Sequence, residues 1–372
     1  MDNGFDLALG SYDAEVSGLH LWEDSSQLLN MKAQFAYRPH SDNITQLSFH
    51  DNTLASASAD ETVKIYDVST KREGVTLLGH NGSVNKVGWA NDSGETYLLS
   101  GGDDGIVCLW RKRDWKLIKE LRGSGSSITG MAVHPSSKVV VSIGKDGKLN
   151  MWDLIKGKVA FSAKLKMESK KGWDVVWEKG KGGCYALWNE SMVAVYSAAG
   201  KLVRTLECEN EVCAVEFVSS TEILTAGDGK EVRLWDLKSQ KQAATCAVHE
   251  HGIRGLAVVS DTIISGDSHG GLKVWDKRRN EVRIETKFGR GMRLTCMAAT
   301  KRATSTINGE QKMEKNGETE RNGQMGKKRK MGKNGKSEKN VADNADANTA
   351  SKRKRQKRKR QLQESKRRKV QT

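Results

Sequence analysis

Three side chains that could carry out chemistry together lie within a short stretch of the chain: His80, Ser100 and Asp104. These are the residue types of a hydrolytic triad, in which the imidazole takes a proton from the serine hydroxyl and the carboxylate orients the imidazole. The same types recur in fragments elsewhere, most completely between residues 40 and 66. A catalytic centre is unique whereas a structural element repeats, so the recurrence favours a structural role.

No other stretch has the spacing that catalysis or cofactor binding requires. The sequence contains no phosphate-binding loop before a helix, no metal-ligand cluster and no nucleophile elbow. The six cysteines form no Cys-x-x-Cys pair, so we expect reduced thiols rather than disulfides or a zinc site. The sequence therefore predicts no catalytic residue, no metal and no cofactor, and an enzyme is the least favoured class of function.

The segment around Ser100 has the pattern of two strands joined by a tight turn. Residues 100–110 contain an Asp-Gly turn followed by alternating apolar residues, which predicts a β-hairpin. Near-copies recur along the chain at intervals of 39 to 44 residues, each ending in an aromatic residue. The closing aromatics are Trp22, Tyr66, Trp110, Trp152, Tyr196, Trp235 and Trp275. This period, with its Trp-Asp endings, resembles that of WD-repeat propellers, in which each repeat forms one four-stranded blade.

The two chain ends are expected to share one blade. Residues 7–10 and 17–22 match the middle strands of a blade, yet no innermost strand precedes them. Residues 293–298 match the innermost strands of other repeats and can supply the missing one. We therefore predict an all-β, seven-bladed WD-repeat β-propeller over residues 1–299, closed by both chain ends so that no sheet edge is free. Its short, apolar innermost strands are expected to be buried on both faces.

The resemblance to WD repeats also implies a role for the polar residues of the third repeat. In WD-repeat blades a His, a Ser, an Asp and a Trp form a buried chain of hydrogen bonds, and the matching residues here are His80, Ser100, Asp104 and Trp110. We expect this tetrad to stabilise the blade, because each polar group satisfies another inside a low-dielectric core. The repeat that ends at Tyr196 departs most from the pattern, either through sequence drift or because a partner docks there.

The positive charge of the chain is concentrated in its C-terminal segment. Residues 300–372 contain 24 Lys and Arg against 8 Asp and Glu and no aromatic residue, so they hold the whole net charge of +16 while residues 1–299 are neutral. This composition predicts a disordered Lys/Arg-rich tail. The basic residues of its four clusters are Lys327, Lys328, Arg329, Lys330, Lys352, Arg353, Lys354, Arg355, Lys357, Arg358, Lys359, Arg360, Lys366, Arg367, Arg368 and Lys369.

Dense Lys and Arg suit both nuclear import and contact with RNA phosphates. Because the segment has no aromatic residue, base stacking is excluded and RNA binding should be almost blind to base sequence. The segment lacks the apolar face or lipidation motif of a membrane-surface anchor, and no apolar run is long enough to span a bilayer. We therefore expect protein and nucleic-acid partners rather than a membrane.

Beyond generic WD repeats, residues 10–13, 60–67, 100–110, 134–161 and 293–297 resemble the p21-activated kinase-interacting protein 1-like family, with residues 134–161 the most specific. The resemblance implies a non-enzymatic scaffold for assembly of the large ribosomal subunit in the nucleolus. Its implied partners are ribosome-assembly proteins and pre-rRNA phosphates, with a monomeric propeller inside a large particle. It also implies negative regulation of a p21-activated kinase.

Two other functions fit the same features. In the first, the propeller is a kinase-signalling adaptor and the basic tail serves only for nuclear import. In the second, the chain is a chromatin-associated WD-repeat reader of histones. Recovery of kinases alone, or of nucleosomes, with the purified chain would distinguish these functions from ribosome assembly.

Overall fold

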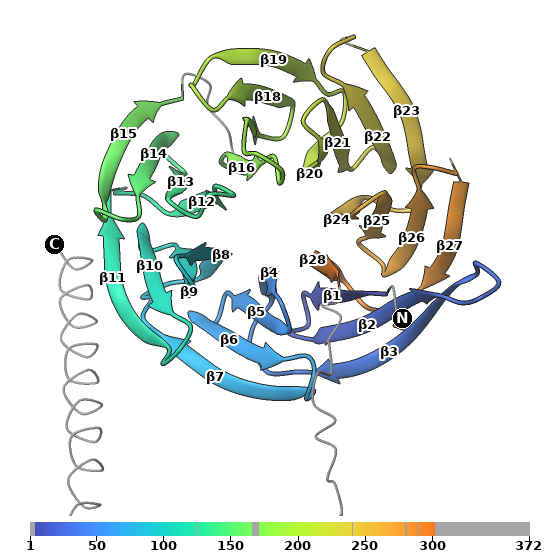
Figure 1. Ribbon diagram of the computed structural model, residues 1–372, viewed down its shortest axis with the longest axis horizontal. Helices are drawn as coiled ribbons and strands as arrows, with labels where there is room; N and C mark the ends of the chain where they lie inside the picture. Colours follow the sequence, from blue (N-terminus) through green and yellow to red (C-terminus); the bar gives the residue numbers. More distant parts are fainter. Residues whose placement is uncertain are drawn as a thin grey trace, which may run out of the picture. The chain divides into compact units, whose positions relative to one another are not determined.

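The computed structural model describes residues 4–123, 125–165, 171–239, 241–279, 281–289 and 291–301. Within these ranges the regular structure is all β-strand, and seven four-stranded antiparallel sheets stand around a common axis like the blades of a propeller (Figure 1). The predicted all-β, seven-bladed propeller is confirmed. The last strand ends at Lys301, close to the boundary predicted at residue 299. The predicted tail, from residue 302 onward, lies outside the described residues, and its disorder stays a prediction.

The four strands of each blade lie side by side, from the innermost strand at the centre of the ring to the outermost strand at its rim (Figure 1). Blade one is β28 (Leu294–Lys301), β1 (Phe5–Ser11), β2 (Val16–Glu23) and β3 (Leu29–Tyr37). Blade two is β4 (Ile44–His50), β5 (Thr53–Ser58), β6 (Thr62–Asp67) and β7 (Arg72–Leu78). Blade three is β8 (Val84–Asp92), β9 (Glu95–Gly102), β10 (Ile106–Arg111) and β11 (Lys116–Arg122). Blade four is β12 (Ile128–Val133), β13 (Val139–Gly144), β14 (Lys148–Asp153) and β15 (Lys158–Lys164).

The remaining three blades follow the same order. Blade five is β16 (Asp174–Trp177), β17 (Cys184–Trp188), β18 (Met192–Ser197) and β19 (Leu202–Glu207). Blade six is β20 (Val212–Ser219), β21 (Glu222–Gly227), β22 (Glu231–Asp236) and β23 (Lys241–Val248). Blade seven is β24 (Ile253–Val259), β25 (Thr262–Asp267), β26 (Gly271–Asp276) and β27 (Glu281–Lys287). In the predicted Asp-Gly turn between β9 and β10, Gly105 has a φ of 73°, a conformation that glycine adopts without strain.

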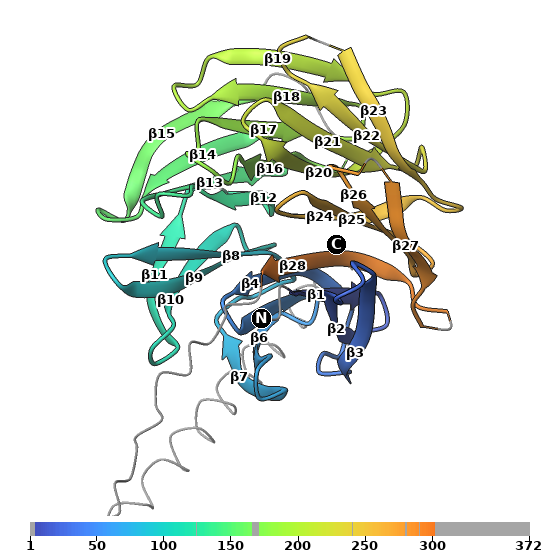
Figure 2. The ribbon, with the colours of Figure 1, turned by 45° about the vertical axis from the view of Figure 1, so that its right-hand side comes forward.

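Blade one is closed by both chain ends, as predicted. Strand β1 pairs antiparallel with β2 on one side and with β28 on the other, so that Leu9 lies opposite Met297 (Figure 2). Gly10 permits this closure, because a Cβ at that position would lie 2.7 Å from Cys296 Sγ and 2.8 Å from a methyl group of Ile44 in blade two. The closure therefore depends on a close approach of three strands.

The innermost strands are not buried on both faces, so that prediction is wrong. In β4, Ile44 and Leu47 are buried while the other five residues are half-buried. The innermost strands face the centre of the ring, and the fully enclosed position falls to the second strand of each blade, such as β13, in which five of six residues are buried. Each of these sheets also keeps two edges, one at its innermost strand and one at its outermost strand. The prediction that closure of the ring leaves no sheet edge free is therefore wrong.

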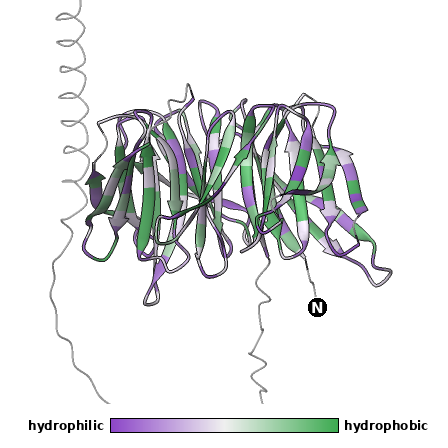
Figure 3. Ribbon diagram, turned by 90° about the horizontal axis from the view of Figure 1, so that it is seen from above, coloured by the Kyte–Doolittle hydropathy of each residue, from purple (hydrophilic) through white to green (hydrophobic). Residues whose placement is uncertain are grey.

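Hydrophobic cores form between neighbouring blades rather than inside one sheet. One core joins Ala57 and Ile65 of blade two to Val87 and Leu98 of blade three. Trp110, one of the closing aromatics, is 4% exposed and belongs to the same core. Seen edge-on, the strands are mainly hydrophobic while hydrophilic residues gather in the loops at both ends of the strands (Figure 3). Successive side chains of a strand point to opposite faces of its sheet, so each blade has two faces that can pack against the two neighbouring blades.

Candidate interaction face

The structure brings the four predicted residues of blade three together. Trp110 Nε1 donates to Ser100 Oγ at 2.9 Å, Ser100 Oγ lies 2.8 Å from His80 Nε2, and His80 Nδ1 lies 3.0 Å from Asp104 Oδ2. Because the indole can only donate, the serine hydroxyl donates to His80 Nε2 and His80 Nδ1–H donates to the carboxylate. Ser100 is fully buried, and its hydroxyl is already paired at both ends. The geometry is that of a structural hydrogen-bonded chain, since a nucleophile must reach a substrate.

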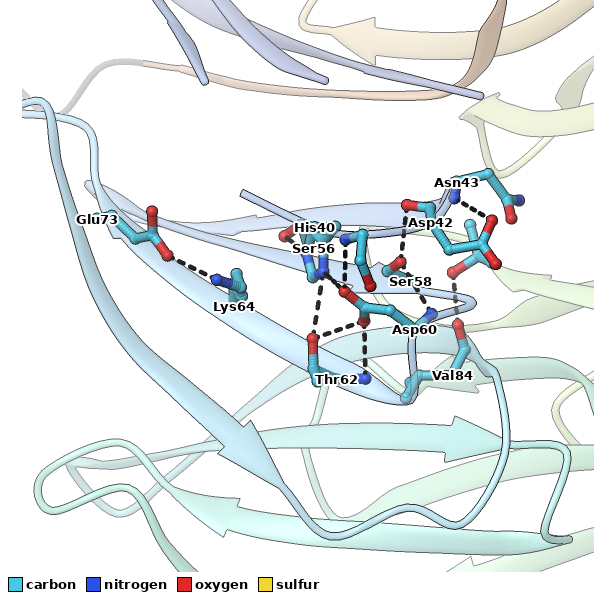
Figure 4. A network of polar contacts seen from close by, with 12 residues as sticks. His40, Asp42, Asn43, Ser56, Ser58, Asp60, Thr62, Lys64, Glu73 and Val84 are labelled. Atoms are coloured by element: carbon cyan, nitrogen blue, oxygen red, sulfur yellow. Dashed lines mark hydrogen bonds and ion pairs between the residues drawn. The ribbon is translucent and has the colours of Figure 1, made fainter. Parts of the chain in front are cut away.

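Blade two carries an equivalent network (Figure 4). His40 Nδ1 lies 2.9 Å from Asp60 Oδ2, His40 Nε2 lies 2.7 Å from Ser56 Oγ, and Ser56 Oγ lies 3.1 Å from the Tyr66 hydroxyl. Burial lowers the pKa of His40, against the opposing effect of the Asp60 carboxylate. The tyrosine hydroxyl thus takes the place that the indole N–H has in blade three.

A third network, in blade seven, was missed by the sequence analysis. His249 Nε2 lies 2.7 Å from Ser265 Oγ, and His249 Nδ1 lies 3.3 Å from Asp267 Oδ2. The carboxylate comes from the end of β25 instead of the turn that follows it, so a search of the turn position finds no Asp. The spacing of 16 residues from His249 to Ser265 was a usable signal, because it equals the spacing from His40 to Ser56.

These networks define one face of the propeller, which we term the turn face. It comprises the loops that enter the innermost strands and the turns between second and third strands, since His80 and Asp104 come from these two places and meet there. On this face the second residue of four innermost strands donates a side-chain hydrogen bond to a backbone carbonyl of the next blade. The donors, with their acceptors, are Thr45 (Val84), Asn85 (Ile128), Thr129 (Trp173) and Thr295 (Ile44).

The corresponding positions in blades five, six and seven hold Asp174, Cys213 and Arg254 instead. Asp174 Oδ2 lies 2.5 Å from Lys86 Nζ of blade three, so this ion pair skips blade four. Arg254 Nη1 lies 2.7 Å from Asp228 Oδ1 and 2.8 Å from Cys213 Sγ. Burial raises the pKa of the Cys213 thiol, against the opposing effect of the Arg254 guanidinium. At two of these three positions a charged side chain thus replaces the neutral donor of the other blades.

Blade five, which ends at Tyr196, lacks the tetrad. Leu187 occupies the place of the tetrad serine, since Tyr196 pairs with Tyr185 as Trp110 pairs with Leu98. The rings of Tyr185 and Tyr196 stack at 5.4 Å between centroids. Glu190 stands at the turn position that Asp104 has in blade three.

The carboxylate of Glu190 retains one function of the missing tetrad. It accepts the backbone N–H of Lys171 at 2.5 Å, as Asp104 accepts that of Asn81 at 3.0 Å. The longer glutamate side chain therefore still fixes the loop that enters the innermost strand. It does so without a histidine, and the surrounding face is left open.

A hollow of about 370 Å³ opens on this arc of the turn face. Its lining residues are Thr129, Lys171, Gly172, Trp173, Asp174, Trp188, Asn189, Glu190, Glu211, Val212, Cys213 and Arg254. We term it the blade-five hollow. The Glu211 carboxylate bonds Lys171 Nζ and raises the pKa of that ammonium group. Charges of both signs around two tryptophans suit a polar protein segment better than an apolar small molecule.

Other predicted features have no place on this face. The four basic clusters between residues 327 and 369 lie outside the described residues. In the part of the chain that the structure describes, no group of three or more His, Cys, Asp or Glu side chains could hold a metal ion. Among the same residues, no helix is long and apolar enough to cross a membrane.

Comparison with known proteins agrees with the repeat pattern. The family described as WD domain, G-beta repeat matches residues 31–67, 72–111, 115–153 and 200–236. These matches leave out most of blades one and five and all of blade seven. Fold and repeats together define a WD-repeat β-propeller.

Similar proteins place the chain more narrowly within this class. The Xenopus laevis p21-activated protein kinase-interacting protein 1-like is 28% identical over 80% of this chain and 83% of its own length. The Schizosaccharomyces pombe Shk1 kinase-binding protein 15 is 28% identical over 72% of this chain and 77% of its own length. The Saccharomyces cerevisiae protein MAK11 is 26% identical over 54% of this chain and 53% of its own length. Over most of its length the chain is thus similar to proteins of the p21-activated protein kinase-interacting protein 1-like group.

Proposed function

We propose that this chain is a non-enzymatic scaffold for assembly of the large ribosomal subunit in the nucleolus. The propeller binds ribosome-assembly proteins, and the basic residues of segment 300–372 contact pre-rRNA phosphates. The observation that carries the proposal is the division of charge: a neutral propeller is followed by a segment that holds the whole net charge of +16. The family resemblance given above supports the ribosomal setting.

The binding chemistry follows from this division. A cationic segment without aromatic residues binds RNA through phosphates, and its affinity falls steeply with salt because counterions are released. If eight phosphates are neutralised, the log–log salt slope is about −6 for single-stranded RNA. The propeller supplies specificity through its faces, and the blade-five hollow on the turn face offers charged and polar groups to a protein partner.

Affinity purification followed by RNA sequencing tests the proposal. The full chain should recover large-subunit precursor rRNA, and a chain ending at Lys301, which keeps β28, should lose most of it. Because the removed segment also carries the predicted import signals, the shortened chain needs a foreign nuclear import signal as a matched control. Equal recovery of precursor rRNA by both chains would contradict the role of the basic segment.

A second candidate function is binding of a p21-activated kinase, with negative regulation of that kinase. It is favoured by the names of two relatives, which describe a p21-activated kinase-interacting protein and a kinase-binding protein. Recovery of a kinase with the shortened chain, in the absence of ribosomal proteins and rRNA, would favour this function. Recovery of nucleosomes instead would favour a chromatin reader.

A further inference from the structure

The outermost strand of blade four, β15, is less anchored than those of blades two, three and five. Six of its seven residues are exposed and none is buried. In three blades the outermost strand carries a buried leucine, which pairs with the second residue of the third strand. These leucines are Leu77 in blade two, Leu121 in blade three and Leu206 in blade five. In blade four the residue at this register is Ala163, which is only half-buried. A small side chain thus takes the place of the leucine that anchors the outermost strand in those three blades.

The same strand exposes apolar side chains beside an unpaired edge. Val159 is 42% exposed and Phe161 is 55% exposed. A shift of register in the strand pair sets Val159 opposite Trp152 and Phe161 opposite Met151, so the two side chains project from opposite faces of β15. Ile155, in the turn that leads into the strand, is 67% exposed. β15 ends the sheet β12-β13-β14-β15, so its outer row of backbone N–H and C=O groups has no neighbouring strand among the described residues (Figure 1). Such an edge can accept one further strand.

This edge lies in the basic part of a polarised propeller. Residues 111–181 contain 17 Lys and Arg against 7 Asp and Glu, so the rest of the neutral propeller is acidic by the same amount. Lys158 and Lys164 stand at the two ends of β15, and neither forms an ion pair with any residue that the structure describes. The carboxylate of Asp153, which lies opposite Lys158 in the strand pair, is already paired with Lys156. A partner therefore meets uncompensated positive charge at both ends of the strand.

The positive charges of Lys158 and Lys164 exclude two possible occupants of the β15 edge, the C-terminal segment and a second copy of the chain. The C-terminal segment has the same sign as β15 and is repelled. A second copy that paired antiparallel about Phe161 would place Lys158 opposite Lys164 at both ends, and like charges directly opposite destabilise a strand pair. Nucleic acid could use the lysines but would leave Val159, Phe161 and the backbone edge without partners. An acidic segment in an extended conformation satisfies all three features at once.

We propose that β15 is a docking edge for an acidic, extended segment of a partner protein, which adds to blade four as a fifth strand. The carboxylates of the segment pair with Lys158 and Lys164, and its apolar side chains cover Val159 and Phe161. The proposal rests on the scaffold function proposed above and gives the chemistry of one protein partner. The lysines also prevent pairing between copies of the chain, a common role of charged residues on edge strands.

Hydrogen exchange of the full chain with a capped peptide Glu-Val-Glu-Phe-Glu-Val-Glu tests the proposal. Saturating peptide should slow exchange of β15 amides by about tenfold or more, while β7 and β11 stay unchanged. This readout separates docking on β15 from binding of the acidic peptide to the basic C-terminal segment, which cannot protect β15. In the variant Lys158→Glu/Lys164→Glu the protection should disappear, and a peptide with Lys in place of each Glu should now protect the strand.

The matched control is Lys241→Glu/Lys287→Glu, which makes the same change in net charge on the exposed ends of β23 and β27. It should leave protection by the acidic peptide intact. Equal loss of protection in both double variants, or no protection of β15 in the unaltered chain, would overturn the proposal. Protection by oligouridylate but not by the peptide would overturn it in favour of a nucleic-acid surface. Failure of precursor rRNA recovery bears only on the proposed ribosomal function and leaves these outcomes unaffected.

Discussion

Lys86 and Asp174 form an ion pair between blades three and five, with 2.5 Å between Nζ and Oδ2. Blade four leaves room for it at Gly130, where a Cβ would lie 2.7 Å from the backbone oxygen of Trp173 and 2.8 Å from Asp174 Cα. Blade five lacks the buried tetrad, and this pair ties its innermost strand to a blade that has one. Blade five, the most divergent blade, is therefore linked directly to blade three by an ion pair to which blade four contributes no side chain.

We predict that Lys86→Met lowers the free energy of unfolding by about 1–2 kcal/mol, between the values for exposed and buried ion pairs. The side chains are 16% and 26% exposed, so the unpaired Asp174 carboxylate stays only partly solvated. Chemical denaturation measures the effect. The double variant Lys86→Met/Asp174→Leu should lose less than the sum of the two single variants, and strict additivity would show that the pair is not coupled.

His80→Ala should lower the free energy of unfolding by about 2–4 kcal/mol, because both Ser100 and Asp104 lose a partner inside the core. The matched control is His251→Ala, since His251 is half-buried and stacks only on His269. The control should change stability by less than about 0.5 kcal/mol. Equal effects of the two substitutions in thermal or chemical denaturation would show that the tetrad does not stabilise blade three.

Stability should fall as the pH is lowered from about 7 toward 5, the range just below the ordinary histidine pKa of about 6.5. Burial lowers the pKa of both His40 and His249 in the folded chain, so below this ordinary pKa the unfolded chain binds more protons. Each histidine contributes a slope of at most about 1.4 kcal/mol per pH unit. Denaturation at several pH values measures it. His40→Gln should reduce the slope, and an unchanged slope would contradict the assignment to His40.

Closure of the ring by β28 makes a prediction about chain length. A chain that ends at Lys301 should unfold cooperatively near the temperature of the full chain, because it keeps the 28 strands that the structure describes. A chain that ends at Met292 lacks β28 and uncovers the edge of β1 together with the core residues Leu7 and Leu9. We expect it to aggregate or to lose its cooperative transition in circular dichroism. A stable monomer ending at Met292 would contradict closure by both chain ends.

The parts of the fold that local chemistry determines could be predicted from the sequence. A closing aromatic marks each repeat and an Asp-Gly turn marks three of the hairpins, and the period of the aromatics gives the number of blades. The closure of blade one could be predicted because residues 293–298 carry the same strand pattern as the other innermost strands.

Long-range relations could not be obtained in the same way. The pairing of Lys86 with Asp174 joins residues 88 positions apart, and no local pattern marks either one. The network of His249 was missed because its carboxylate, Asp267, comes from the strand rather than the turn. The burial of the innermost strands was mispredicted because apolar composition does not say which strand faces the centre of the ring. Glu190 could be identified as a departure, but its bond to Lys171 depends on the loop geometry.

The central claim is that a neutral propeller carries a cationic segment onto precursor rRNA, and ultraviolet crosslinking of the full chain in cells tests it most directly. Crosslinked peptides and their RNA are both identified after digestion. We predict that the peptides fall within residues 327–369 and that the RNA is large-subunit precursor rRNA. Crosslinks confined to residues 1–301, or RNA of other classes at the basic clusters, would contradict the account.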